Sequence, residues 1–142
     1  MKSKSIQHIF SLALILVAAA VFTNKSFAQE KKVKWAEWTA YHAVMSNTFH
    51  PSEEGNFEPI RTRSAELVTK AEEWLKSTPP KEFDKPQVKE LLVLLVKESK
   101  ELDALVKNKA GDDELKKALF NLHERFHSIV GACQNTEEHK EK

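Results

Sequence analysis

Hydrophobic side chains recur along this chain three and four residues apart, the spacing that places them on one face of an α-helix. Three glycines and five prolines interrupt the pattern, because these residues favour turns and helix ends over helix interiors. The interruptions divide the chain beyond residue 32 into four long amphipathic segments. We therefore expect four helices joined by short loops.

The first two segments are separated by the sequence HPSEEGNFEP. We expect the first helix to cover roughly Val33 to His50 and to end at Pro51, since the residue before a proline avoids helical geometry. Its predicted apolar stripe is Trp35, Trp38, His42, Met45 and Phe49. A second helix should begin at Pro59, where a missing N–H group has little effect in the first turn, and stop at STPP. Its predicted stripe is Ile60, Ser64, Leu67, Ala71 and Trp74.

The last two segments meet at the sequence NKAGDDE. Asp84 is the predicted cap of the third helix, which should continue to about Asn108. The stripe of this helix is Val88, Leu91, Leu92, Leu95, Leu102 and Leu105. The fourth helix should begin at GDDE, because acidic residues favour the positive end of a helix. Its stripe is Leu115, Leu119, Leu122, Phe126, Ile129 and Cys133.

No segment alternates polar and apolar residues as a half-buried strand would. Four helices with short connections pack most simply as antiparallel neighbours. The sequence therefore predicts an all-α fold, an antiparallel up-down-up-down four-helix bundle that spans residues 29–134. Residues 135–142 are charged and lack apolar anchors, and we expect them to form a disordered tail.

The first 28 residues have the pattern of a secretory signal peptide. Lys2 and Lys4 precede an apolar run from Ile9 to Phe22, and the small residues of "SFA" then mark a cleavage site. The run is about 14 residues long, short of the roughly 20 that a membrane-spanning helix needs. We therefore expect a periplasmic or secreted protein with no membrane anchor after cleavage.

The charge and the cysteine content limit the kinds of molecule that this protein is expected to bind. Lys2, Lys4 and Lys25 would leave with the signal peptide, so 22 − 3 = 19 basic residues would face 21 acidic ones. This balance gives no support for binding to nucleic acid. Cys133 is the only cysteine, so no internal disulfide can form. We expect it to be buried, with pairing between two chains of a homodimer and metal ligation as the alternatives.

Three histidines are the main candidates for chemistry. His123 and His127 lie four residues apart, which brings two imidazoles close enough on a helix to share one metal ion. His42 falls on the predicted stripe of the first helix, and matching antiparallel levels would place it opposite His123. The sequence therefore predicts a transition-metal site, zinc or copper, with His42, His123 and His127 as ligands. The alternative is structural: two solvated edge residues and a core histidine bonded to the backbone.

Several other side chains are possible additional ligands. Met45 lies one turn from His42 and would favour copper if it bound. His50, Glu53 and Glu54 belong to the loop between the first two helices and would reach the ion only if that loop covered the end of the bundle. Glu66 is expected at the level of His42 on the second helix.

The stretch HERFH matches the zinc-peptidase pattern H-E-x-x-H, with Glu124 after the first histidine. In such enzymes the two histidines bind zinc and the glutamate acts as general base. The chain offers no strand for the usual active-site groove. Our leading interpretation is therefore a non-enzymatic metal-binding protein, such as a carrier, buffer or sensor. A zinc hydrolase and a structural or partner-binding bundle without a ligand are the alternatives.

An exported four-helix layout with candidate ligands on the first and last helices resembles the superfamily of cytochrome c-prime and the soluble b-type cytochromes. "VGACQN" keeps Cys133 but lacks the CxxCH haem-attachment motif of the c-prime members. The resemblance to the b-type relatives implies non-covalent haem held by Met45 with His123 or His127. The stretch YHAVMSNTFHPSEEGNFEPIR is also similar to small secreted bacterial proteins without an assigned role.

Overall fold

The computed structural model describes residues 34–134, and this part of the chain contains helices and no strand. The predicted signal peptide and the predicted charged tail lie outside the described residues. A short 3₁₀ helix, η1, precedes the third long helix. The helices are α2 (Ala36–Glu53), α3 (Glu58–Lys76), η1 (Lys81–Phe83), α4 (Pro86–Lys107) and α5 (Asp112–Gln134).

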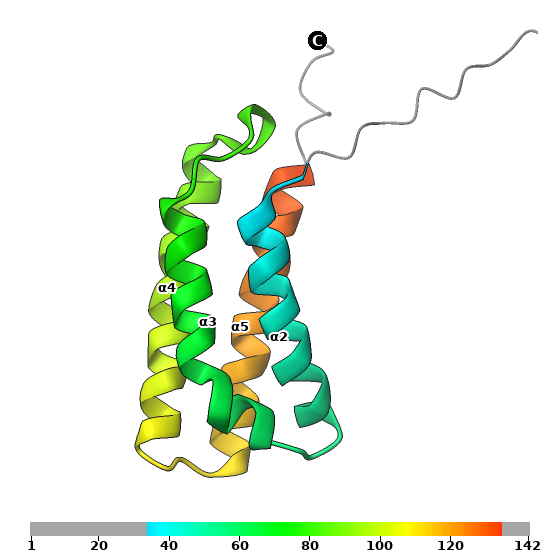
Figure 1. Ribbon diagram of the computed structural model, residues 1–142, viewed down its shortest axis with the longest axis vertical. Coiled ribbons are helices and arrows are strands. Elements are labelled where there is room, and N and C mark those ends of the chain that lie inside the picture. Colours follow the sequence, from blue (N-terminus) through cyan, green and yellow to red (C-terminus); the bar gives the residue numbers. More distant parts are fainter. Residues whose placement is uncertain (1–33, 135–142) are drawn as a thin grey trace, which may run out of the picture. The chain divides into compact units, whose positions relative to one another are not determined.

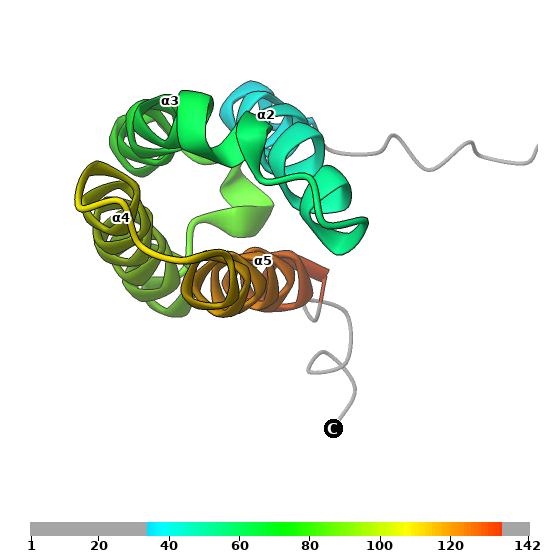
Figure 2. The ribbon, with the colours of Figure 1, turned by 90° about the horizontal axis from the view of Figure 1, so that it is seen from below.

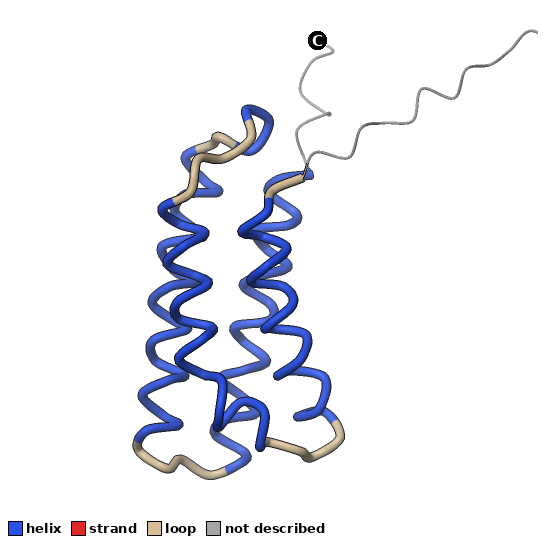
Figure 3. Tube along the Cα trace, viewed as in Figure 1, coloured by secondary structure: helices blue, strands red, loops and turns tan. Residues whose placement is uncertain are grey.

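The four long helices form an antiparallel bundle, which confirms the predicted fold class. The chain runs down in α2, up in α3, down in α4 and up in α5 (Figure 1). Viewed along the helices, they follow one another around a ring in chain order, and α5 contacts α2 to close it (Figure 2). Loops at the ends of the helices make the connections (Figure 3). None of the helices in the described part is long and apolar enough to cross a membrane.

Two predicted helix boundaries are wrong. Pro51 does not end α2, which continues through Glu53. A proline in the last turn removes few hydrogen bonds, and the carbonyl of Pro51 still accepts one from the N–H of Asn56 at 2.9 Å. The turn is completed at Gly55, whose φ of 84° lies in the left-handed region that glycine adopts without strain.

Asp84 does not cap α4. Lys85 occupies that position with an extended backbone and no side-chain cap, and Pro86 opens the helix. The fixed φ of proline suits the first helical position, so no capping side chain is required to start the helix there. The Lys85 ammonium instead donates a hydrogen bond of 2.9 Å to the carbonyl of Ala132 near the end of α5.

The interior of the bundle agrees with prediction in α3 and α5, where every residue of both predicted stripes is buried. In α4 most of the predicted stripe is buried, while Leu91 and Leu105 are only partly covered. Helix α2 differs from prediction because it is rotated about its axis relative to the orientation that its predicted stripe implied. Its buried residues within the helix are Tyr41, Val44, Met45, Thr48, Phe49 and Ser52.

The rotation of α2 overturns the prediction that His42 is a core residue. Tyr41 is fully buried and His42 is exposed. The rotated face also buries Thr48 and Ser52, whose hydroxyl groups donate hydrogen bonds to carbonyls of their own helix. Because these two hydroxyl groups are satisfied locally, burying Thr48 and Ser52 carries no large desolvation penalty.

Candidate metal centre

Helix α5 brings the two predicted histidine ligands together. The Nε2 atoms of His123 and His127 are 3.2 Å apart, and their ring centroids are 4.4 Å apart. The pairing follows from the helix itself, because residues four apart are neighbours on its surface. The side chain of His123 is 22% exposed and His127 is exposed, so the pair lies at the edge of the bundle.

The ring of His123 is held in place by a contact from α2. Phe49 stacks on it face to face, with centroids 3.9 Å apart and an interplanar angle of 4°. The Nδ1 atom of His123 is buried and has no hydrogen-bond partner. The carboxylate of Glu124 lies 3.7 Å from this atom, beyond hydrogen-bond distance. The stacking fixes the plane of the imidazole, and Nε2 is the nitrogen that faces His127.

Burial favours the neutral, metal-binding form of His123. Desolvation is the main reason that the pKa of this imidazole is lowered, and the proximity of His127 lowers it further. Glu124 acts in the opposite direction. Only a deprotonated imidazole nitrogen can bind a metal ion, so the surroundings of His123 prepare it for ligation.

The geometry of the pair suits one tetrahedral ion. Two Zn–N bonds of about 2.0–2.1 Å to nitrogens 3.2 Å apart enclose an angle of about 100–105°. The tetrahedral angle is close to this value. The same separation also allows one ring to donate an N–H hydrogen bond to the other, so an ion at this place would take the position of the shared proton.

Arg125, which lies between the two histidines in the sequence, forms a salt bridge with α4. Arg125 donates to both carboxylate oxygens of Glu98 on α4, at distances of 2.8–3.1 Å. This two-pronged contact is stronger than a single ion pair, and it directs Arg125 toward α4. His123 lies on the other flank of α5, against Phe49 of α2.

The prediction that His42 lies opposite His123 is wrong. The His42 ring stacks on Phe126, with centroids 5.1 Å apart, and Phe49 takes the position opposite His123. Within the described residues no group of three or more His, Cys, Asp or Glu side chains could hold a metal ion. The structure thus assembles the α5 pair and does not add His42 to it.

The predicted loop ligands lie in or beside the last turn of α2. His50 Nδ1 is 2.9 Å from the carboxylate of Glu53, and both side chains are exposed. His50 also meets Phe49 edge to face, with ring centroids 5.7 Å apart. Both residues influence the pKa of His123 electrostatically, His50 lowering it and Glu53 raising it. Glu54 is exposed at the end of the helix.

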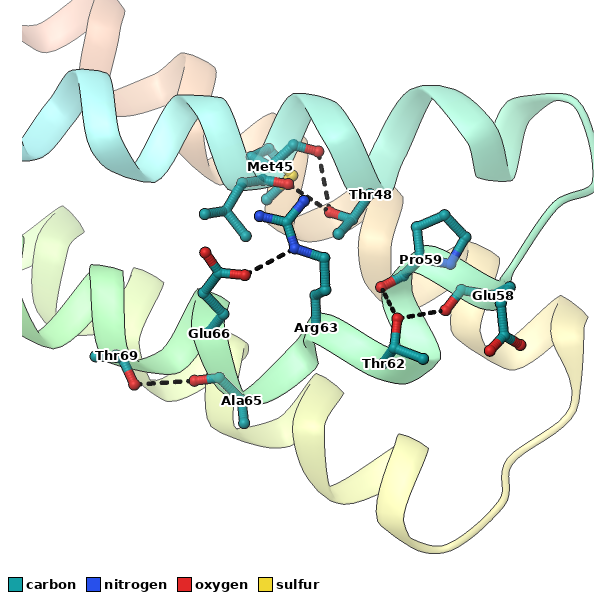
Figure 4. Close-up of polar contacts among 10 residues, drawn as sticks. Met45, Thr48, Glu58, Pro59, Thr62, Arg63, Ala65, Glu66 and Thr69 are labelled. Carbon is teal, nitrogen blue, oxygen red and sulfur yellow. Dashed lines mark hydrogen bonds and ion pairs between the residues drawn. The ribbon is translucent and has the colours of Figure 1, made fainter.

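Met45 and Glu66 have other roles. Met45 is fully buried in the apolar core. The carboxylate of Glu66 accepts a hydrogen bond of 2.7 Å from Arg63, one turn earlier on α3 (Figure 4). That bond holds the pKa of Glu66 below its ordinary value. The carboxylate is therefore engaged within its own helix.

Aromatic rings from three helices pack together in the interior. Tyr41, Trp74 and Phe126, from three different helices, pack against one another with ring centroids 5.7–6.1 Å apart. All three side chains are buried. Cys133 is buried as predicted, and desolvation raises the pKa of its thiol to about 11.

Phe49 is the one residue of the candidate metal site whose role the sequence did not reveal. It was expected only as an apolar residue of the first helix, and its contact with His123 depends on how α2 and α5 are aligned.

Comparisons with known protein families, with characterised proteins and with solved structures find no match to this chain.

Proposed function

We propose that this protein is an exported metal-binding four-helix bundle that holds a transition-metal ion through His123 and His127 and acts as a carrier, buffer or sensor. One observation carries the proposal: the two Nε2 atoms lie 3.2 Å apart on one helix, at the separation of two imidazoles on a tetrahedral ion. The proposed role is non-enzymatic, and the pair lies at the edge of the bundle, where His127 is exposed.

The surroundings of His123 support ligation through Nε2. Histidines that bind metals usually donate the N–H of their other nitrogen to a carboxylate or carbonyl. The Nδ1 atom of His123 is buried without a hydrogen bond, and Glu124 is the carboxylate beside it. A metal ion on Nε2 would leave the ring proton on Nδ1, where a small movement of Glu124 completes the bond.

The donor set favours zinc or copper. Two imidazoles suit zinc, copper and nickel, and they suit magnesium and calcium poorly. Met45 is fully buried in the core, so its thioether gives no reason to prefer copper. His42 lies against Phe126, and the proposal therefore depends on the α5 pair alone.

The matching H-E-x-x-H pattern does not favour a hydrolase. A peptidase of that class needs its glutamate beside the metal-bound water. Glu124 lies instead beside Nδ1 of His123, the ring nitrogen that faces away from His127. Its carboxylate is therefore positioned to orient a ligand and is poorly positioned to activate water.

The test is metal loading of the purified protein, followed by elemental analysis, calorimetric titration with zinc and copper salts, and a visible spectrum. We expect stoichiometric metal and no haem absorption band. Replacing His123 and His127 together with alanine should abolish loading, whereas His50→Ala, at a nearby exposed histidine, should leave it intact. Equal loading by the double variant would refute the proposal.

Glu124→Gln separates the metal-binding role from a hydrolytic one. We expect this variant to retain bound zinc with affinity lowered about tenfold or more, the size of effect known for such outer partners. Peptide hydrolysis by the zinc-loaded wild type that disappears in Glu124→Gln would instead establish the hydrolase.

A further inference from the structure

We propose that the ion is shared between two copies of this chain, so that four imidazoles, two from each copy, bind it across a two-fold interface formed by α5. The inference rests on the proposed function and names the partner of the same site. Two features of the molecule support it: one chain supplies an incomplete set of metal ligands, and a large apolar side chain is exposed beside them.

One chain supplies only part of a coordination shell. Zinc in closed protein sites is bound tetrahedrally by four ligands, and the described residues contain no group of three candidate ligands. Two positions on an ion held by His123 and His127 therefore point away from the bundle. A second copy related by two-fold symmetry brings the same two imidazoles to those positions, because such an interface presents the same patch from both sides.

One large apolar side chain lies exposed beside the pair. Phe120 is 53% exposed, and with His123 and His127 it forms a row at spacings of three and four residues on one flank of α5. It also lines an open groove of about 500 Å³ together with Phe49, and the other lining residues are polar or charged: Ser52, Glu53, Asp113, Lys116 and Lys117. A large aromatic side chain exposed next to metal ligands is the kind of residue that becomes buried at the centre of an interface.

An antiparallel crossing of two α5 helices would cover Phe120. It lies three residues before His123, and Val130 lies three residues after His127. A two-fold axis that passes midway between the levels of His123 and His127 thus places Phe120 of one copy level with Val130 of the other. Beside Val130, a Cβ atom added to Gly131 would meet no described atom within 4 Å, so there is open space for the incoming ring.

The experiment combines the zinc stoichiometry from calorimetry with the mass in solution, measured by sedimentation with and without zinc chloride. A reducing agent is present so that Cys133 cannot link the chains. We expect one zinc per two chains and a doubling of mass that a chelator reverses. One zinc per chain on a monomer would overturn this inference and leave the proposed function standing. No zinc binding would overturn both.

Surface variants test the interface independently of the metal ligands. Phe120→Ser should weaken zinc-dependent dimerisation at least about tenfold, because the apolar area that the dimer would bury is lost. Val93→Ser is the matched control, since Val93 is 51% exposed but lies on α4. A Phe120→Ser dimer as stable as that of Val93→Ser would show that this face of α5 is not the interface.

Discussion

His123 meets a different chemical group on each part of its ring. Phe49 covers one face, His127 lies at Nε2, and Glu124 lies beside Nδ1. Phe49 limits the tilt of the imidazole, His127 limits the direction in which it points, and Glu124 limits its choice of tautomer. A ligand held in this way loses less conformational entropy when it binds an ion, which is the advantage of preorganisation.

The lowered pKa of His123 predicts that acid destabilises the metal-free protein. Above the ordinary histidine pKa of about 6.5, the ring is neutral in both the folded and the unfolded chain. As the pH falls below that value, the unfolded chain takes up the proton first, because burial lowers the pKa in the folded state. The free energy of unfolding should therefore decrease until the pH passes the folded-state pKa.

Urea unfolding between pH 7.5 and 5.5, in the presence of a chelator, measures this dependence. His123→Gln should show a shallower loss of stability over that interval than the wild type. His42→Gln controls for the removal of an exposed histidine and should keep the wild-type slope. If His123→Gln loses stability as steeply as the wild type, the dependence has another origin.

At the scale of the helix, the sequence was most informative where only one face is apolar. The stripes of α3 and α5 were predicted correctly, including the buried Ser64 and Cys133. Helix α2 carries large apolar side chains on adjacent faces, so two stripes that share Met45 and Phe49 both had helical spacing. Burial of Tyr41 in place of His42 depends on the neighbouring helices, and a periodic pattern does not contain that information.

Helices α3 and α4 are joined by a buried polar contact whose loss should be costly. The hydroxyl of Ser64 donates a 2.8 Å hydrogen bond to Asp103, and Lys107 pairs with the same carboxylate. Burial acts against ionisation of Asp103, but these two donors outweigh it and hold its pKa below the ordinary value. The carboxylate therefore stays charged between the two helices.

Asp103→Ala should destabilise the protein by about 1–3 kcal/mol, because it leaves the buried Ser64 hydroxyl without its acceptor. Urea denaturation measures the change. Glu101→Ala, at an exposed position of the same helix with a longer 3.7 Å ion pair to Lys97, should remain within about 0.5 kcal/mol of the wild type. Equal values for the two variants would contradict the role of Asp103.

At the scale of the whole bundle, the candidate site depends on how the first and last long helices are aligned. The sequence predicted that they lie side by side, because the short loops allow little else. The predicted alignment, with His42 opposite His123, was wrong, because packing of large rings such as Trp38 and Tyr41 on Phe126 sets it. As a result, Phe49 contacts His123, and His42 contacts Phe126.

Because Phe49 and His123 belong to different helices, an ion bound at the α5 pair should stabilise the folded chain as a whole. Zinc at about 100 times its dissociation constant adds roughly 2.7 kcal/mol if it binds only the folded state. For a domain near 100 residues this corresponds to a rise in Tm of about 10–20 °C. Thermal unfolding followed by circular dichroism measures it, and the double alanine variant of His123 and His127 should show no rise.

The stacking of Phe49 on His123 also makes this one residue visible in solution. The carbon-bound protons of the imidazole lie over the face of the phenyl ring, where its circulating electrons shield them from an applied field. Their nuclear magnetic resonance signals should therefore be displaced upfield from those of the same residue in the unfolded chain. Proton uptake, zinc binding and contact with a second chain can each be followed at that signal without a label.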